Sequence, residues 1–361
     1  MKTYREIKKY PKSDHPRREN LQTQPLRKTQ TFNNPEVITE SWYPLCSSKK
    51  IRKNQCQSFS ILRQRIVIFR GESGQAYALD AYCPHMGADL GNGHVIGERL
   101  QCYFHQWSFD SNGKTTRSGV DPKECLASYP VEEKYGFIWI YAGKKPTHSV
   151  PTPPGLEKVE TSALHLKRGT LFAHHHVMMA GGIDIQHFKS VHDLDIDFQF
   201  HIDETAPDVY CWNMEGKIPT GSYLQRFARW LTGGLFRYQA LFAGGTITTL
   251  NYGAGLSFRG HGHYLLPNVY ILWGATPLLE GVSSVDIFFI VPKYKGLWAP
   301  IKRVFMYLFT FLLLVVLRDD DLKAFPNMRF QLGSLNKEDQ SVIELAQRLD
   351  QLQISSWTGR Q

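Results

Sequence analysis

Two short motifs of cysteine and histidine are the residues of this chain best suited to chemistry. Cys83-Pro84-His85 is followed, after sixteen further residues, by Cys102-Tyr103-Phe104-His105. Each motif offers one thiolate and one imidazole, which is the ligand pattern of a [2Fe–2S] cluster held by two cysteines and two histidines. Structural zinc sites also use two cysteines and two histidines, but each loop usually offers like ligands. We therefore predict an iron–sulfur cluster, with structural zinc as the alternative, at Cys83, His85, Cys102 and His105.

A second group of candidate ligands lies further along the chain. Asp184-Ile185-Gln186-His187 and His192 form the pattern D-x2-H-x4-H. Two imidazoles five residues apart lie near one face of a helix, or of a helix with a widened turn, where they could chelate one metal. Histidine pairs at this spacing also occur by chance on surface helices, so the pair is informative mainly because the first motif precedes it.

With both motifs in this order, the chain resembles the α subunit of the Rieske non-haem iron oxygenases, from about residue 42 to about residue 347. In that family two histidines and one carboxylate bind a mononuclear Fe(II). The resemblance implies that His187 and His192 are iron ligands. It also implies that Asp184 links the Rieske histidine of one protomer, His105, to an iron-ligating histidine of the next.

The carboxylate ligand must come from farther downstream. Resemblance to the acidic stretch near the family's C-terminus implies Asp339, with Glu338 and the run Asp319-Asp320-Asp321 as alternatives. Asn336 followed by Asp339 also matches a helix N-cap, where the acid would favour the helix dipole without touching a metal. A helix is predicted here in either case, because apolar residues recur at helical spacing at Val342, Ile343, Leu345, Ala346, Leu349 and Leu352.

Two features lie just upstream of the candidate iron ligands, an alanine at position 180 and a run of three histidines. Many relatives carry Asn four residues before the bridging Asp, and this chain has Ala180 there. The run His174-His175-His176 lies just upstream, next to the apolar Leu171-Phe172-Ala173. Histidines in such a segment are predicted to pack or to form hydrogen bonds rather than to bind iron.

The length and the strand pattern predict the domains that must position these groups. A chain of 361 residues can form two domains of ordinary size. Short apolar runs at 65–70, 76–79 and 137–141 predict an all-β domain, and runs at 246–250, 263–266, 270–273 and 285–290 predict an antiparallel sheet flanked by helices. The fold class is therefore α+β. The resemblance implies a Rieske [2Fe–2S] domain followed by a helix-grip (START-like) catalytic domain.

Proline and charge patterns suggest the boundaries. Four prolines punctuate residues 146–155, which predicts a linker between a Rieske domain at 41–145 and a catalytic domain at 156–361. Residues 1–40 are polar and basic, which predicts a mobile tail. The tail carries much of the net charge of +9, and no nucleic-acid motif accompanies it, so we expect attraction to an acidic electron donor and no nucleic-acid partner.

The remaining cysteines indicate a reducing compartment. Cys46, Cys56, Cys125 and Cys211 are widely scattered and imply no disulfide framework. The N-terminus also lacks the apolar core that a signal peptide needs. We therefore expect a cytoplasmic protein.

One apolar segment complicates that expectation. Residues 304–317 contain no charge, and Arg303 and Arg318 flank them. Fourteen residues fall short of the roughly 20 that span a bilayer. A buried helix or a contact between subunits is the favoured interpretation, and a helix lying at a membrane surface near the entrance of the active site is the alternative.

Within the family, Trp42-Tyr43-Pro44 and residues 83–91 look most similar to the branch with 3-ketosteroid 9α-hydroxylase and cholesterol 7-desaturase. The resemblance implies a homotrimer that activates O2 reductively to hydroxylate, demethylate or desaturate a lipophilic, sterol-like or aromatic substrate. No flavin or nicotinamide fingerprint is present, so we expect a separate reductase, with or without a ferredoxin, to supply electrons. A Rieske electron carrier and a lipid-binding protein with a non-catalytic second domain are the alternatives.

Overall fold

The computed structural model describes residues 31–115, 125–192, 195–221, 234–253, 268–279, 281–328 and 332–359, with Tyr223, Gln225, Arg226, Arg229 and Phe330. Residues Thr31–Gln361 form one compact unit. Residues 1–30 of the predicted tail and the predicted strand at 263–266 lie outside the described residues. The described end of the tail is packed, because Phe32 and Ile38 are buried.

The N-terminal part is built from three antiparallel sheets. The first has the order β1-β10-β9, from Trp42–Ser47, Phe137–Tyr141 and Val131–Lys134. The second has the order β2-β3-β4-β8, from Gln55–Ile61, Gln64–Arg70, Ala76–Asp80 and Ser128–Tyr129. The third has the order β5-β6-β7, from His94–Ile96, Arg99–Gln101 and Ser108–Phe109.

Strand β3 shows why this part folds as it does. Its central residues are β-branched or aromatic and fully buried, and successive side chains of a strand point to opposite faces. Ile66 and Ile68 therefore pack into one apolar core, whereas Val67 and Phe69 pack into another beneath the two cysteine motifs. The second core packs against the two loops that carry the candidate cluster ligands.

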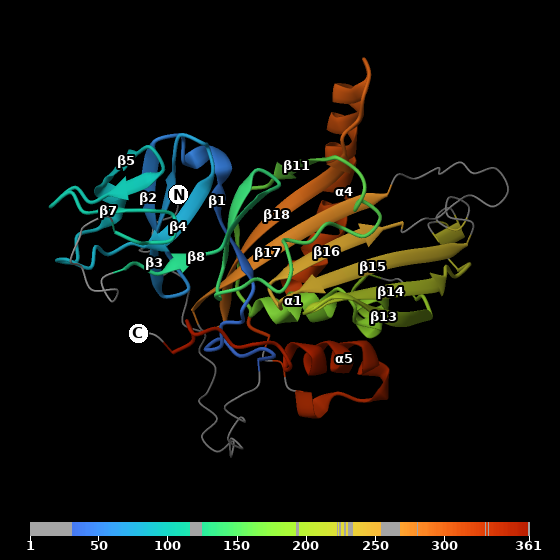
Figure 1. Cartoon of the computed structure of the whole chain (residues 1–361). Helices are drawn as coiled ribbons and strands as arrows, with labels where there is room; N and C mark the ends of the chain where they lie inside the picture. Colours follow the sequence, from blue (N-terminus) through green and yellow to red (C-terminus); the bar gives the residue numbers. More distant parts are fainter. Residues whose placement is uncertain are drawn as a thin grey trace. The chain divides into compact units, whose positions relative to one another are not determined.

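The C-terminal part is dominated by one antiparallel sheet of eight strands (Figure 1). The order is β11-β18-β17-β16-β15-β14-β13, and β12 also pairs with β18. The strands are β11 Thr161–His165, β12 Gly169–Leu171, β13 Phe198–Ala206, β14 Val209–Lys217, β15 Leu235–Ala243, β16 Ile247–Tyr252, β17 Val269–Leu279 and β18 Val282–Pro292.

Four described α-helices accompany this sheet. They are α1 His175–Gly181, α2 Ile185–His192, α4 Ala299–Ala324 and α5 Gln340–Leu349. Short 3-10 helices cover η2 Ser48–Lys50, η3 Leu90–Asn92, η5 Leu332–Ser334 and η6 Lys337–Asp339. The helix predicted from the apolar spacing after Asp339 is α5, which buries Val342, Leu345, Ala346 and Leu349 in the core of the C-terminal part. The α+β fold class is thereby confirmed.

The first and last described segments of the chain meet in the N-terminal part. Thr39 bridges to Ile354, and the backbone N–H of Ser355 donates to the carbonyl of Ile38 over 2.8 Å. Trp357 is buried in the N-terminal core and packs edge-on against Tyr129. The last described residues therefore stabilise the sheets that precede residue 142.

Candidate metal centres

The two cysteine motifs form a pair of similar loops. Cys83 and Cys102 are buried, and the carbonyl of each accepts a hydrogen bond from the residue four positions later, Gly87 at 2.8 Å and Gln106 at 3.1 Å. Both of those residues have left-handed backbone, with φ of 73° and 57°. Glycine adopts this conformation without cost, and Gln106 shows that the loop shape is kept even where a side chain is present. The repeated turn presents the two motifs in the same way.

Like ligands of the two loops lie next to each other, the histidine rings in contact and the two cysteine thiols interacting. The rings of His85 and His105 lie 4.6 Å apart, and the ring of Trp107 stacks on His85 at 4.8 Å. Burial is the main cause that raises the pKa of the Cys83 thiol to about 11, and the neighbouring Cys102 thiol contributes. Such thiols become thiolates when a metal binds them. Two buried sulfurs beside two exposed imidazoles suit a [2Fe–2S] cluster in which each iron has one kind of ligand.

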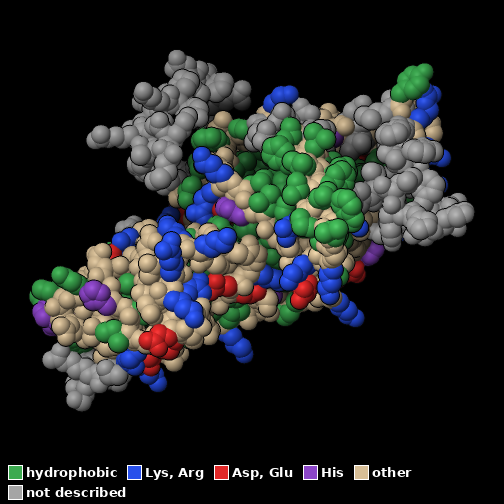
Figure 2. Space-filling model, turned by 90° about the horizontal axis from the view of Figure 1, so that it is seen from above, with side chains coloured by type: hydrophobic (Ala, Val, Ile, Leu, Met, Phe, Trp, Pro, Cys, Tyr) green, Lys and Arg blue, Asp and Glu red, His purple; other side chains and the backbone are tan. Residues whose placement is uncertain are grey.

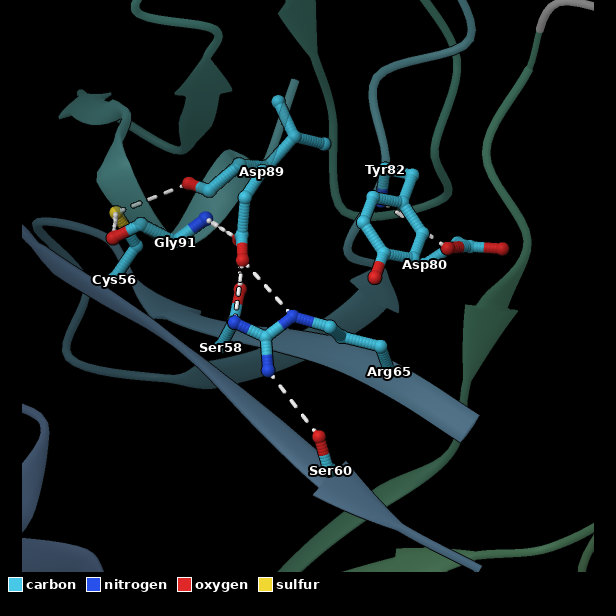
Figure 3. Close-up of polar contacts among 9 residues, drawn as sticks. Cys56, Ser58, Ser60, Arg65, Asp80, Tyr82, Asp89 and Gly91 are labelled. Carbon is cyan, nitrogen blue, oxygen red and sulfur yellow. Dashed lines mark hydrogen bonds and ion pairs between the residues drawn. The ribbon is translucent and has the colours of Figure 1, made fainter. Parts of the chain in front are cut away.

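A part-buried carboxylate links the first loop to the neighbouring sheet (Figure 3). Asp89 accepts hydrogen bonds from the Ser58 hydroxyl, from the Gly91 N–H at 2.8 Å and from the Arg65 Nε at 2.9 Å. Burial raises the pKa of Asp89, but these donors outweigh burial, so the pKa lies below its usual value. The network joins the segment after His85 to β2 and β3.

This network predicts a pH dependence of stability. Because the folded pKa of Asp89 is lowered, its contribution is present above the unfolded pKa of about 4 and is lost as the pH falls below that value. Asp89→Asn should lower the free energy of unfolding by about 1 kcal/mol at pH 7 and by much less near pH 3. Denaturant unfolding at both pH values measures the difference. Asp80→Asn, in the same sheet, is the matched control, and an equal loss for Asp89→Asn at both pH values would contradict the prediction.

A second group of ligand atoms lies between α2 and the C-terminal end of α4. The Nε2 atoms of His187 and His192 are 3.1 Å apart, and Asp321 Oδ1 lies 2.9 Å from the first and 3.1 Å from the second. Atoms that bind one ion about 2.1 Å away at right angles lie about 3 Å from one another. The three atoms therefore fit one face of a mononuclear metal site, with two histidines and one carboxylate.

Aromatic packing holds the first histidine in place. The ring of Phe325 stacks on His187 at 5.5 Å, with 21° between the planes. Gly181 permits this contact, since a Cβ atom there would lie 2.5 Å from the Phe325 ring. On the other side of α2, Phe188 is buried against Phe198 and Tyr238. The imidazole thus has a fixed orientation before any metal binds.

The electrostatics of the site favour an ionised carboxylate. Burial raises the pKa of Asp321, but hydrogen bonds with His187 and His192 outweigh it and hold the pKa below its usual value. The negative charge in turn adds to burial in raising the pKa of Tyr252 and of Tyr238. Two neutral phenols therefore face an anionic ligand, and their rings lie 4.9 Å apart.

The structure corrects the expectation for Asp339. Its Oδ1 accepts a hydrogen bond from Gln186 Nε2 and its Oδ2 accepts one from the Asn336 N–H, both over 2.8 Å. Asn336 and Asp339 form a capping box at the start of η6. Both carboxylate oxygens are therefore used by neutral donors, and the group near the two histidines contains Asp321 instead.

The phase of α4 against the sheet explains the position of Asp321. Thr310 is buried on the face of α4 that packs against the sheet, and Asp321 follows it by eleven residues, or about three helical turns. The two residues therefore share a face of the helix.

Asp184 acts as the N-cap of α2. Its Oδ1 accepts hydrogen bonds from the backbone N–H groups of Gln186 at 2.9 Å and His187 at 3.1 Å. Its Oδ2 makes no hydrogen bond with the residues that the structure describes. Ala180, which occupies the position of the Asn in many relatives, is buried in the apolar core. The contact of Asp184 with a second protomer remains a prediction.

The three consecutive histidines have structural contacts. Burial lowers the pKa of His174 to about 4 and those of His175 and His176 further, so all three rings are neutral. His176 Nδ1 accepts from the Asn33 N–H at 2.9 Å, so its Nε2 carries the proton and donates to the carbonyl of Gly245 at 3.1 Å. Both ring nitrogens of His176 are occupied by these hydrogen bonds. His176 therefore has no free lone pair with which to act as a third metal ligand beside His174 and His175. These contacts agree with a role in packing.

Parts of this chain are similar to known proteins. Residues 41–130 match the model of the Rieske [2Fe-2S] domain. Cholesterol 7-desaturase nvd of Bombyx mori is 30% identical over 166 residues, which cover 44% of this chain and 36% of the relative. Protein TIC 55, chloroplastic, of Arabidopsis thaliana is 26% identical over 216 residues, which cover 52% and 39%. The chain thus matches well under half the length of these curated relatives.

Solved structures agree over a longer stretch. Dicamba monooxygenase bound to dicamba superposes with a TM-score of 0.57 at 16% identity, covering 87% of this chain and 98% of the other. NdmB of Pseudomonas putida CBB5 gives a TM-score of 0.61 at 13% identity, covering 88% and 93%. At these identities the match establishes a shared fold. The resemblance predicted from the two motifs is confirmed.

Proposed function

We propose that this chain, which carries a Rieske [2Fe–2S] domain and shares the fold of Rieske oxygenases, is a terminal oxygenase that uses O2 and externally supplied electrons. The observation that carries the proposal is the triangle of His187 Nε2, His192 Nε2 and Asp321 Oδ1, with sides of 2.9 to 3.1 Å. Two histidines and one carboxylate that leave open positions are typical of non-haem Fe(II) oxygenases. The iron would supply the chemistry of O2 activation.

The roles of the protein side chains follow from their positions. His187, His192 and Asp321 hold the metal on one side, and Phe325 fixes the orientation of His187. Cys83, His85, Cys102 and His105 hold the cluster that relays single electrons. Exposure of both cluster imidazoles would let a separate reductase or ferredoxin, or a neighbouring subunit, approach closely.

We infer that the substrate is lipophilic. Apolar and aromatic side chains surround the two iron-binding histidines, including Phe188, Phe198, Tyr238 and Tyr252. The relatives named above include a cholesterol desaturase, and the fold is shared with an oxygenase of the aromatic acid dicamba. Hydroxylation, demethylation and desaturation of a C–H-bearing carbon are the reactions compatible with this site.

The two alternative functions, electron carrier and lipid-binding protein, do not account for the group of two histidines and one carboxylate. An electron carrier needs only the Rieske domain, and a lipid-binding protein needs only an apolar binding site. Neither requires Asp321 to be ionised beside two histidine nitrogens. A homotrimer in which Asp184 of one subunit approaches His105 of the next would join the two centres through the carboxylate oxygen of Asp184 that the N-cap does not use.

Metal analysis tests the proposal. The purified protein should contain about three irons per chain, two from the cluster and one from the mononuclear site. The reduced protein should show a Rieske-type electron paramagnetic resonance signal. With a reductase system and O2, it should oxidise at least one member of a panel of sterols and aromatic ethers. Two irons per chain and no product would favour the electron carrier, and zinc without the signal would refute the cluster.

A further inference from the structure

Helix α4 has an apolar face that the fold does not use. Trp298, immediately before the helix, and five helical residues are each between 55% and 64% exposed: Ile301, Val304, Phe305, Leu308 and Leu312. At 100° per residue these six side chains fall within an arc of about 120°. Figure 2 shows a broad hydrophobic area where α4 projects, with Lys and Arg side chains around it. We call these six residues the α4 apolar face.

The opposite side of the helix already makes the contacts that the core needs. Met306 and Thr310 are buried, and Phe309 and Leu313 pack against Val269 and other residues of β17 and β18. An ordinary surface helix has one apolar stripe that faces the core and a polar face toward water. This helix has a second apolar face on the outside, and an exposed patch of this kind marks an interaction site.

The charges beside the face indicate the chemistry of its partner. Lys295 and Lys302 are exposed; Lys295 lies just before the helix, and Lys302 lies about 40° beyond the edge of the face at 100° per residue. Neither forms an ion pair with an acidic side chain among the described residues, whereas Lys293 contacts Glu160 at 3.3 Å. Apolar side chains flanked by free cations are complementary to a lipid surface with anionic headgroups.

We propose that the α4 apolar face docks on the surface of an anionic lipid bilayer. Among the described residues, no helix is both long and apolar enough to cross a membrane. The helix would lie at the interface, with its apolar side chains among the acyl chains and its cations at the headgroups. Figure 1 shows one end of α4 projecting beyond the sheet.

The same helix connects this surface to the candidate iron site. Asp321 follows Leu312 by nine residues, which is a rise of about 14 Å along the helix. A lipophilic substrate dissolved in the bilayer would therefore be held a short distance from the metal. This consequence rests on the proposed function, whereas the binding of lipid does not.

Flotation of the full-length protein with vesicles tests the proposal. One set of vesicles contains phosphatidylcholine alone, and the other contains equal parts of phosphatidylcholine and phosphatidylserine. Wild-type protein should float with the anionic vesicles, and Phe305→Ser/Leu308→Ser should bind them at least about 100-fold more weakly. Lys302→Glu should weaken binding to the anionic vesicles about fivefold or more, and should have little effect with phosphatidylcholine alone.

Ile96→Ser is the matched control, because Ile96 is 58% exposed on the Rieske domain, away from α4 in sequence. It should bind vesicles as wild type does. Iron content and the Rieske signal of each variant show that it has folded. Equal flotation of wild type and Phe305→Ser/Leu308→Ser would overturn the proposal. A variant that loses an oligomeric contact while vesicle binding is unchanged would assign the face to a second copy of the chain.

Two results separate this inference from the proposed oxygenase function. If the protein binds vesicles but oxidises no substrate, the docking surface stands and the function fails. If wild-type protein oxidises a sterol but ignores vesicles, the function stands and the docking surface is refuted. If the docking surface and the oxygenase function are both correct, Phe305→Ser/Leu308→Ser should lose turnover of a sterol in vesicles and keep turnover of a detergent-dispersed sterol.

Discussion

Asp321→Ala is expected to remove the mononuclear iron and to reduce product formation by a factor on the order of 1000 or more, while the Rieske spectrum is unchanged. The reason is that Asp321 supplies the only carboxylate oxygen in the described structure within 3.1 Å of both His187 Nε2 and His192 Nε2. Without it, only two imidazoles remain for an ion that prefers a set of ligands with an anionic member. The iron content should fall from about three irons per chain to about two.

Asp339→Ala is the matched control for this prediction. It removes a carboxylate from the same region, but one that accepts hydrogen bonds from Gln186 and Asn336. Loss of the capping box should cost about 1 kcal/mol of stability and leave three irons per chain. The opposite pattern, with iron lost from Asp339→Ala and kept in Asp321→Ala, would restore the assignment made from the sequence.

The cluster ligands could be predicted because they are local. Each Cys–His pair lies on one loop of at most five residues, so their types and spacing already define the geometry of each loop. The strand pattern was also sufficient for the α+β architecture, since runs such as residues 65–70 alternate between two cores. In these regions neighbouring residues in the chain are neighbours in the fold.

The third candidate iron ligand could not be predicted in the same way. The acids at 319–321 and at 338–339 both lie far from His187 in the sequence. The first group lies in helix α4 and the second immediately precedes helix α5, so helical spacing alone does not distinguish them. Only the phase of α4 against the sheet decides which acid faces the histidines. Asp339 also fitted a helix cap, and the local capping interaction is what the structure contains.

For a related reason, the sequence does not decide whether the apolar segment at residues 304–317 is buried or exposed. A run of fourteen uncharged residues does not reveal how many of its faces will be covered. The strands β17 and β18 cover the side with Met306 and Thr310 and leave the side with Phe305 and Leu308 open. Burial of one face and exposure of the other is a property of the tertiary structure.

Asp184→Asn is expected to leave both metal centres intact and to reduce coupled turnover by about 100-fold. The substitution preserves size and the N-cap, because an Asn oxygen can accept the same hydrogen bonds from Gln186 and His187. What it removes is the negative charge that would orient and connect two imidazoles across a subunit boundary. Reduction of the cluster by the donor should remain fast, and oxidation of the reduced cluster by O2 and substrate should slow.

Two further substitutions separate the cap from the charge. Asp184→Ser keeps a cap but lacks the reach and the charge of a carboxylate, so its turnover should fall as in Asp184→Asn while its stability is kept. Asp184→Ala also loses the cap, which should cost about 1 kcal/mol and loosen the helix that carries both iron-binding histidines. If Asp184→Ser and Asp184→Asn retain full turnover, or if a verified monomer is fully active, Asp184 only caps α2 and the electron path does not pass between subunits.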